Sequence, residues 1–81
     1  MGNGVVGGVR YIVIPSGSTV GTATINLGFS PKACLATAFG ANPEFLDTAT
    51  QMLSSDTIEL RIYAKTAVSS DTTRGVCWLA I

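Results

Sequence analysis

Apolar and polar residues alternate along much of the chain with a period of two, which is the spacing of β-strands that bury one face. The clearest run covers residues 22–27, where alanine, isoleucine and leucine alternate with threonine and asparagine. Residues 57–63 repeat the pattern, with Ile58, Leu60 and Ile62 on one face and Thr, Glu, Arg and Tyr side chains on the other. Both runs predict strands whose apolar faces turn toward a core.

Four other segments carry less regular signals. Residues 9–14 are apolar on nearly both faces, and residues 33–39 alternate between small and mostly larger side chains. Residues 75–81 are apolar on both faces, which predicts a strand that is central in a sheet or covered by a partner. Residues 51–53 indicate only a short strand, and the stretch 44–50 before them is predicted to be an irregular loop.

Turn residues separate these runs, at positions 15–18, 28–31 and 40–43. The tetrapeptide Ser-Ser-Asp-Thr occurs at 54–57 and again at 69–72, and we interpret both copies as the same kind of turn. No segment shows a sustained 3.6-residue helical period. About five to seven short strands separated by turns predict an all-β fold, a small antiparallel β-sandwich or jelly-roll-like domain.

A glycine-rich segment precedes the first predicted strand. We predict that residues 1–8 form a flexible arm, ordered only against a neighbour such as another subunit, and that residues 9–81 form a single β-sandwich domain. Residues 2–7 match the pattern G-x-G-x-x-G. Dinucleotide binding requires a strand before that motif and a helix after it, so we favour the arm.

Composition removes several classes of function. Charged residues make up 12% of the chain, about half the usual share, and the five basic residues are balanced by five acidic ones. Without a basic excess, nucleic-acid binding is not expected. Hydrophobic residues reach 47%, which argues against a disordered chain. The longest apolar run, residues 76–81, is far shorter than the ~20 residues that span a bilayer, so no membrane insertion is expected.

Catalytic chemistry also lacks its usual residues. The chain contains no histidine, and therefore neither the usual general base near neutral pH nor the commonest metal ligand. Asp56 and Asp71 fall in predicted turns and Glu59 points outward, which argues against a catalytic carboxylate pair. We predict a protein that is not an enzyme and has no metal or cofactor. Cys34 and Cys77 are expected to be free thiols, since the chain shows no targeting signal and the cytoplasm is reducing. A disulfide would require their strands to be neighbours, with Cα atoms within roughly 7 Å.

The small size of the chain points to self-association. A chain of 81 residues buries only roughly 60–65% of the surface that it exposes when unfolded, so its core is marginal. Small domains compensate with disulfides, metals or oligomerisation, and only the last fits this composition. Trp78 lies in an apolar run and is predicted to pack in the core or at a subunit interface. Tyr63 points outward beside Arg61 and, with Tyr11, is a candidate for a binding surface.

Three segments together resemble a known group of proteins. IVIPSG at residues 12–17 leads into TATINL at 22–27, GFSPKA follows at 28–33, and VCWLAI stands at 76–81. The order resembles the small β-sandwich domains of tailed-bacteriophage virion proteins, including the H-type-lectin-like tips of tail fibres. The resemblance covers most of residues 9–81.

The resemblance implies a homotrimeric structural or adhesive part of a phage particle, made in the host cytoplasm and located in the virion. Fibre tips end long chains that supply a shaft, whereas this chain starts at Met1, so we favour a small capsid decoration (cement) protein. Its partners would be further copies of itself and the major capsid protein or another virion protein, with the arm lying across the shell. The residues assigned to this subunit or capsid interface are Gly2, Asn3, Gly4, Val5, Val6, Gly7, Gly8 and Trp78.

The alternative is a receptor-binding tip domain of a tail fibre that recognises a host glycan. Its binding surface would consist of Tyr11, Arg61 and Tyr63, because tyrosine rings stack on sugars and arginine supplies polar contacts. A third hypothesis is a subunit of a non-viral lectin or adhesin. The strand pattern and low charge fit it equally well, although the chain shows no export signal.

Overall fold

The computed structural model describes residues 6–39 and 46–81, and in these residues the chain forms six β-strands and no helix. The strands are β1 (Val6–Ile14), β2 (Val20–Asn26), β3 (Cys34–Phe39), β4 (Leu46–Met52), β5 (Thr57–Ala64) and β6 (Thr72–Ala80). All neighbouring strands are antiparallel. The predicted all-β class and antiparallel sandwich are therefore confirmed.

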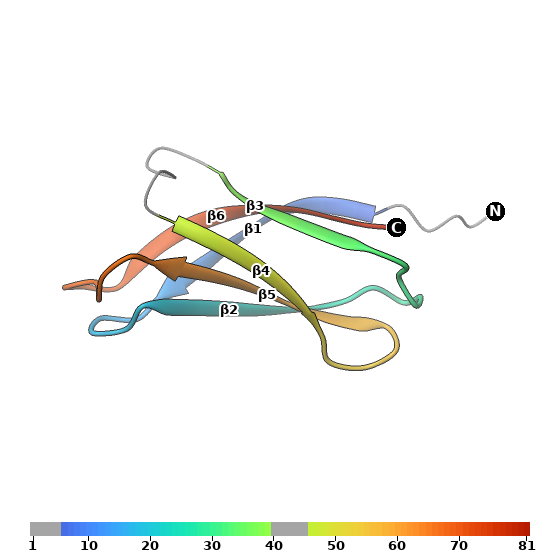
Figure 1. The fold of residues 1–81 in the computed structure, drawn as a ribbon, viewed down its shortest axis with the longest axis horizontal. Coiled ribbons are helices and arrows are strands. Elements are labelled where there is room, and N and C mark those ends of the chain that lie inside the picture. Colours follow the sequence, from blue (N-terminus) through green and yellow to red (C-terminus); the bar gives the residue numbers. More distant parts are fainter. Residues whose placement is uncertain (1–5, 40–45) are drawn as a thin grey trace.

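The strands form two three-stranded sheets that lie in two layers (Figure 1). One sheet has the order β1-β6-β3 and is called here the β6 sheet; the other has the order β2-β5-β4 and is called the β5 sheet. The apolar segment 75–81 lies almost entirely in β6, the central strand of its sheet, as its pattern predicts.

The core fills the space between the layers and consists mainly of branched aliphatic side chains. Its large side chains are at most 2% exposed and are Ile12, Ile14, Ile58, Leu60, Ile62 and Val76. The three from β5 are those that the alternation of residues 57–63 predicts to point inward. The described residues thus contribute six large buried side chains to the core.

Gly21 lets the edge strands of the two sheets approach closely. A Cβ atom at position 21 would lie 2.6 Å from the carbonyl oxygen of Val13 and 2.9 Å from Cγ2 of Ile12. Glycine is needed there because of this contact with β1, since its backbone conformation is an ordinary one.

Strand β1 begins three residues earlier than the sequence predicts. Val6, Gly7 and Gly8 pair with Ala80, Leu79 and Trp78 of β6 and so belong to the strand. Their glycines resemble a flexible arm in the sequence, yet a Cβ atom at Gly7 would lie 2.7 Å from the carbonyl oxygen of Trp78. The backbones of β1 and β6 are therefore too close at Gly7 to admit a side chain there. Residues 1–5 of the predicted arm lie outside the described residues.

Strand β4 is also longer than predicted. Residues 46–52 pair with β5 along their whole length, where the sequence indicates a loop followed by a short strand. The half-buried positions of β4 include Thr48 and Thr50, so apolar and polar residues do not alternate there. Thr48 Oγ1 donates a hydrogen bond of 2.8 Å to the carbonyl oxygen of Ala36 in β3, which satisfies the hydroxyl and joins the two sheets.

The aspartates of the two Ser-Ser-Asp-Thr turns accept different hydrogen bonds. Asp56 Oδ1 accepts hydrogen bonds from the hydroxyls of Ser54 and Thr57, within its own turn. Asp71 Oδ1 instead accepts a 2.9 Å hydrogen bond from the backbone N–H of Ser16, in the loop between β1 and β2. The shared turn chemistry predicted from the repeat is therefore wrong for Asp71, which joins two loops distant in sequence.

Candidate interaction surfaces

The outer face of the β5 sheet is polar. Its residues point away from the core and are Val20, Thr22, Thr24, Asn26, Asp47, Ala49, Gln51, Thr57, Glu59, Arg61 and Tyr63. At its centre Arg61 Nε donates a 2.5 Å hydrogen bond to Glu59 Oε1, and the same contact is an ion pair between the two side chains. Thr22 and Thr24 of β2 stand opposite Arg61 and Glu59. We call this surface the polar face.

Arg61 and Tyr63 lie together on the polar face, as their spacing predicts. Hydrogen bonding to Tyr63, and then to Glu59, raises the pKa of the Arg61 guanidinium above its usual value. The group therefore remains charged, and the carboxylate of Glu59 balances that charge locally. This arrangement presents one aromatic ring beside a paired, partly exposed cation.

The outer face of the β6 sheet is apolar. Its residues are Gly7, Val9, Tyr11, Val13, Leu35, Thr37, Phe39, Thr73, Gly75, Cys77 and Leu79. No residue of this set, all within the described strands, is charged. The six largest apolar side chains of the set are between 41% and 66% exposed. We call this surface the apolar face.

Tyr11 lies on the apolar face and not with Arg61 and Tyr63. Tyr11 and Phe39 flank Gly75 of β6 from the two neighbouring strands. A Cβ atom at Gly75 would lie 3.3 Å from Cε1 of Tyr11 and 3.2 Å from Cδ2 of Phe39, so both rings lean over the glycine. The three candidate glycan-binding residues are thus divided between opposite outer faces of the sandwich.

The candidate interface residues are divided as well. Trp78 is half-buried on the inner side of the β6 sheet and packs against the core. Gly8 stands beside it in β1, and a Cβ atom there would lie 3.7 Å from Trp78 Nε1. Gly7 belongs to the apolar face, while Val6 shares the inner side with Ala80 and is 37% exposed. Residues 2–5 lie outside the described residues.

The two cysteines are free thiols on opposite sides of the same sheet. Cys34 of β3 is half-buried and packs against the core. Cys77 of β6 is exposed at the middle of the apolar face, between Val9 and Thr37. Because the two side chains point in opposite directions from one sheet, no disulfide joins them.

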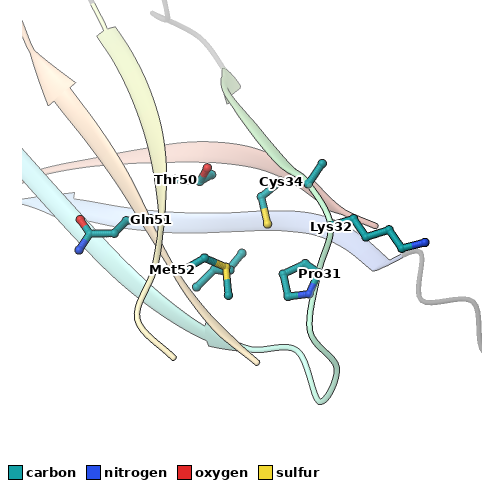
Figure 2. A pocket seen from close by; sticks show the side chains of 8 residues that line it. Pro31, Lys32, Cys34, Thr50, Gln51 and Met52 are labelled. Atoms are coloured by element: carbon teal, nitrogen blue, oxygen red, sulfur yellow. The ribbon is translucent and has the colours of Figure 1, made fainter. Parts of the chain in front are cut away.

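A pocket of about 160 Å³ lies where the start of β3 approaches the end of β4. Pro31 and Cys34 line one side and Met52 the other, and the Cys34 side chain points toward Met52 (Figure 2). The volume is below the roughly 300–1,000 Å³ of ordinary ligand pockets. Sequence reasoning missed this pocket because it forms where strands of the two different sheets, β3 and β4, lie near each other.

Three further findings concern metal ligands, buried polar atoms and membrane-spanning helices among the described residues. Within residues 6–39 and 46–81, no three His, Cys, Asp or Glu side chains gather closely enough to hold a metal ion. In the same residues, every buried side-chain nitrogen and oxygen atom has a hydrogen-bond partner. The described part of the chain also contains no helix of the length and hydropathy that a membrane span requires.

No family model, curated protein or solved structure matches this chain. The resemblance to tailed-phage virion proteins therefore rests on the sequence motifs alone. The structure shows the fold and two outer faces, one polar and one apolar.

Proposed function

We propose that this chain is a structural protein of a tailed-bacteriophage virion, specifically a small capsid decoration protein. It forms a homo-oligomer, a trimer by the resemblance, on the particle surface and ties capsid subunits together. One observation carries the structural role: a broad, uncharged and exposed apolar face covers one side of a domain whose other side is polar. Such a face favours a part that works within an assembly.

The mechanism is the burial of surface between neighbouring subunits. Contacts with the shell would remove apolar and backbone groups from water, and each attached copy would connect capsid proteins that otherwise separate under internal pressure. The segment before β1, residues 1–5, is proposed to lie across the shell. Val6–Gly8 are part of β1 and pair with β6, so they are not included in this segment.

The test is sedimentation of the purified chain with phage shells that lack it. We expect the chain to pellet with the shells, and a variant that lacks residues 1–5 to stay in the supernatant. The variant should keep the circular dichroism of the full chain, because β1 remains complete from Val6 onward. Unchanged pelleting of the shortened chain would exclude the arm, and failure of the full chain to pellet would exclude decoration.

The polar face favours a second candidate, the glycan-binding tip of a tail fibre. Tyr63 and Arg61 lie together there and offer a ring for stacking and a cation for hydrogen bonds. Tyr63→Ala should then abolish binding to a glycan array or to host cells while the unfolding free energy stays near that of the parent chain. Tyr11→Phe, on the opposite face, is the matched control and should bind normally. An array that stays blank at high protein concentration argues against this candidate.

A further inference from the structure

We propose that the apolar face is the surface through which copies of this chain pack against each other. The inference rests on the proposed function in taking the occupant to be another copy of the chain. It adds the surface itself, which lies on the β6 sheet and not on the polar face or at Trp78.

The contrast between the two outer faces is the first argument. Both belong to three-stranded antiparallel sheets of the same chain, and both point away from the same core. The polar face carries threonines and the Arg61–Glu59 pair, as a sheet exposed to water does. None of the residues that β1, β3 and β6 contribute to the apolar face is charged. An overall apolar composition does not explain so uneven a distribution.

The extent of the apolar face is the second argument. Its six largest apolar side chains are 41% to 66% exposed. Together with the smaller residues they present roughly 600–800 Å² of accessible surface, given that a fully exposed aromatic side chain offers ~150–250 Å². That area lies at or above the upper end of the range for the largest apolar patch of a typical monomer, about 300–600 Å². It approaches the ~800 Å² that each partner contributes to a standard stable interface.

The shape of the face suits contact with another ordered sheet. Tyr11 and Phe39 lean over Gly75 from both sides, so one edge of each ring lies against β6. Cys77 and Thr37 in the next row are smaller. Aromatic side chains have few rotatable bonds, so they bury a large area at little cost in side-chain entropy, and they are enriched at subunit interfaces.

The small core explains why the occupant is a permanent one. Among the described residues, six large side chains are fully buried between the two layers, and a chain of this length has a marginal core. A partner that comes and goes would leave the apolar face in water for part of the time. Another copy of the chain is made together with it and presents an equally uncharged surface, in keeping with the depletion of charged residues at the core of subunit interfaces.

The first test measures the solution mass of the purified chain by light scattering, without shells or glycans. We expect a whole-number multiple of 8.4 kDa for the parent chain and a fall to 8.4 kDa for Leu35→Lys, which places a charge on the apolar face at a 66% exposed position. Thr24→Lys is the matched control: it lies on an edge strand of the polar face opposite Glu59 and should keep the parent mass.

The second test uses the thiol of Cys77 and does not depend on a variant of the apolar face. In the Cys34→Ala background only Cys77 can react, and its side chain is exposed in the isolated chain. If copies cover the apolar face, labelling by a small maleimide should be at least tenfold slower than in the unfolded chain in urea. Dilution to the monomer should restore the fast rate.

These outcomes separate the inference from the proposed function. A monomeric parent chain, or an oligomer in which Cys77 labels at the unfolded rate, overturns the inference whether or not shells bind. An oligomer with a protected Cys77 supports it even if the chain ignores shells, in which case the decoration function alone fails. Should Leu35→Lys lose its circular dichroism, the labelling of Cys77 still decides.

Discussion

Glycines determine how closely the strands of this small domain approach each other. Gly21 and Gly8 both lie in edge strands, yet their surroundings differ. A Cβ atom at Gly21 would meet the Val13 carbonyl oxygen at 2.6 Å, while one at Gly8 would meet only the Trp78 ring at 3.7 Å. The same residue type is therefore required at one position and tolerant of change at the other.

Gly21→Ala should lower the free energy of unfolding by about 1–3 kcal/mol, because backbone atoms of β1 must move to admit the methyl group. Gly8→Ala is the control. Its methyl group makes an ordinary contact, so its unfolding free energy should be unchanged or higher by up to about 1 kcal/mol. Urea denaturation of both variants measures the difference. Equal midpoints for Gly21→Ala and the parent chain would show that β1 and β2 do not pack this closely.

At the scale of whole elements, alternation predicted the strands that bury one apolar face. Residues 22–27 and 57–63 fall almost entirely in β2 and β5, with the predicted inward side chains on β5. The pattern missed most of β4 because Thr48 takes a half-buried position, where its hydroxyl bonds to the Ala36 carbonyl oxygen. It missed the start of β1 because glycines have no side chain to alternate. Both the length of β4 and the start of β1 depend on hydrogen bonds to a strand distant in sequence, and a local sequence pattern carries no information about such bonds.

The loop between β5 and β6 gives a prediction for Asp71. Asp71→Ala removes the acceptor for the Ser16 N–H and should lower the unfolding free energy by about 0.5–1.5 kcal/mol. Asp71→Asn keeps a side-chain oxygen and should lose less. Amide hydrogen exchange gives the sharper measurement, since Ser16 should exchange faster in Asp71→Ala and at the parent rate in Asp56→Ala, whose bonds stay within its own turn. Equal Ser16 exchange in the two alanine variants would contradict the link between the loops.

At the scale of the molecule, strand order decides which candidate residues share a surface. Arg61 and Tyr63 are two residues apart on one strand, so their common face could be predicted from spacing alone. Tyr11 lies on the opposite side because β1 belongs to the other sheet. The apolar face needs the same information, since its residues come from β1, β3 and β6 and form one surface only through the pairing of these strands.

If an oligomer buries the apolar face, the thermal stability of the chain should depend on the protein concentration. Association stabilises the folded chain by mass action, so the thermal midpoint Tm should rise by several degrees over a hundredfold increase in total protein. Leu35→Lys should show a lower Tm that does not change with concentration, because its added charge opposes packing at an exposed position of the face. Thr24→Lys should follow the parent curve. Scanning calorimetry measures all three, and a constant Tm for the parent chain would mean that the domain is stable with this face in water.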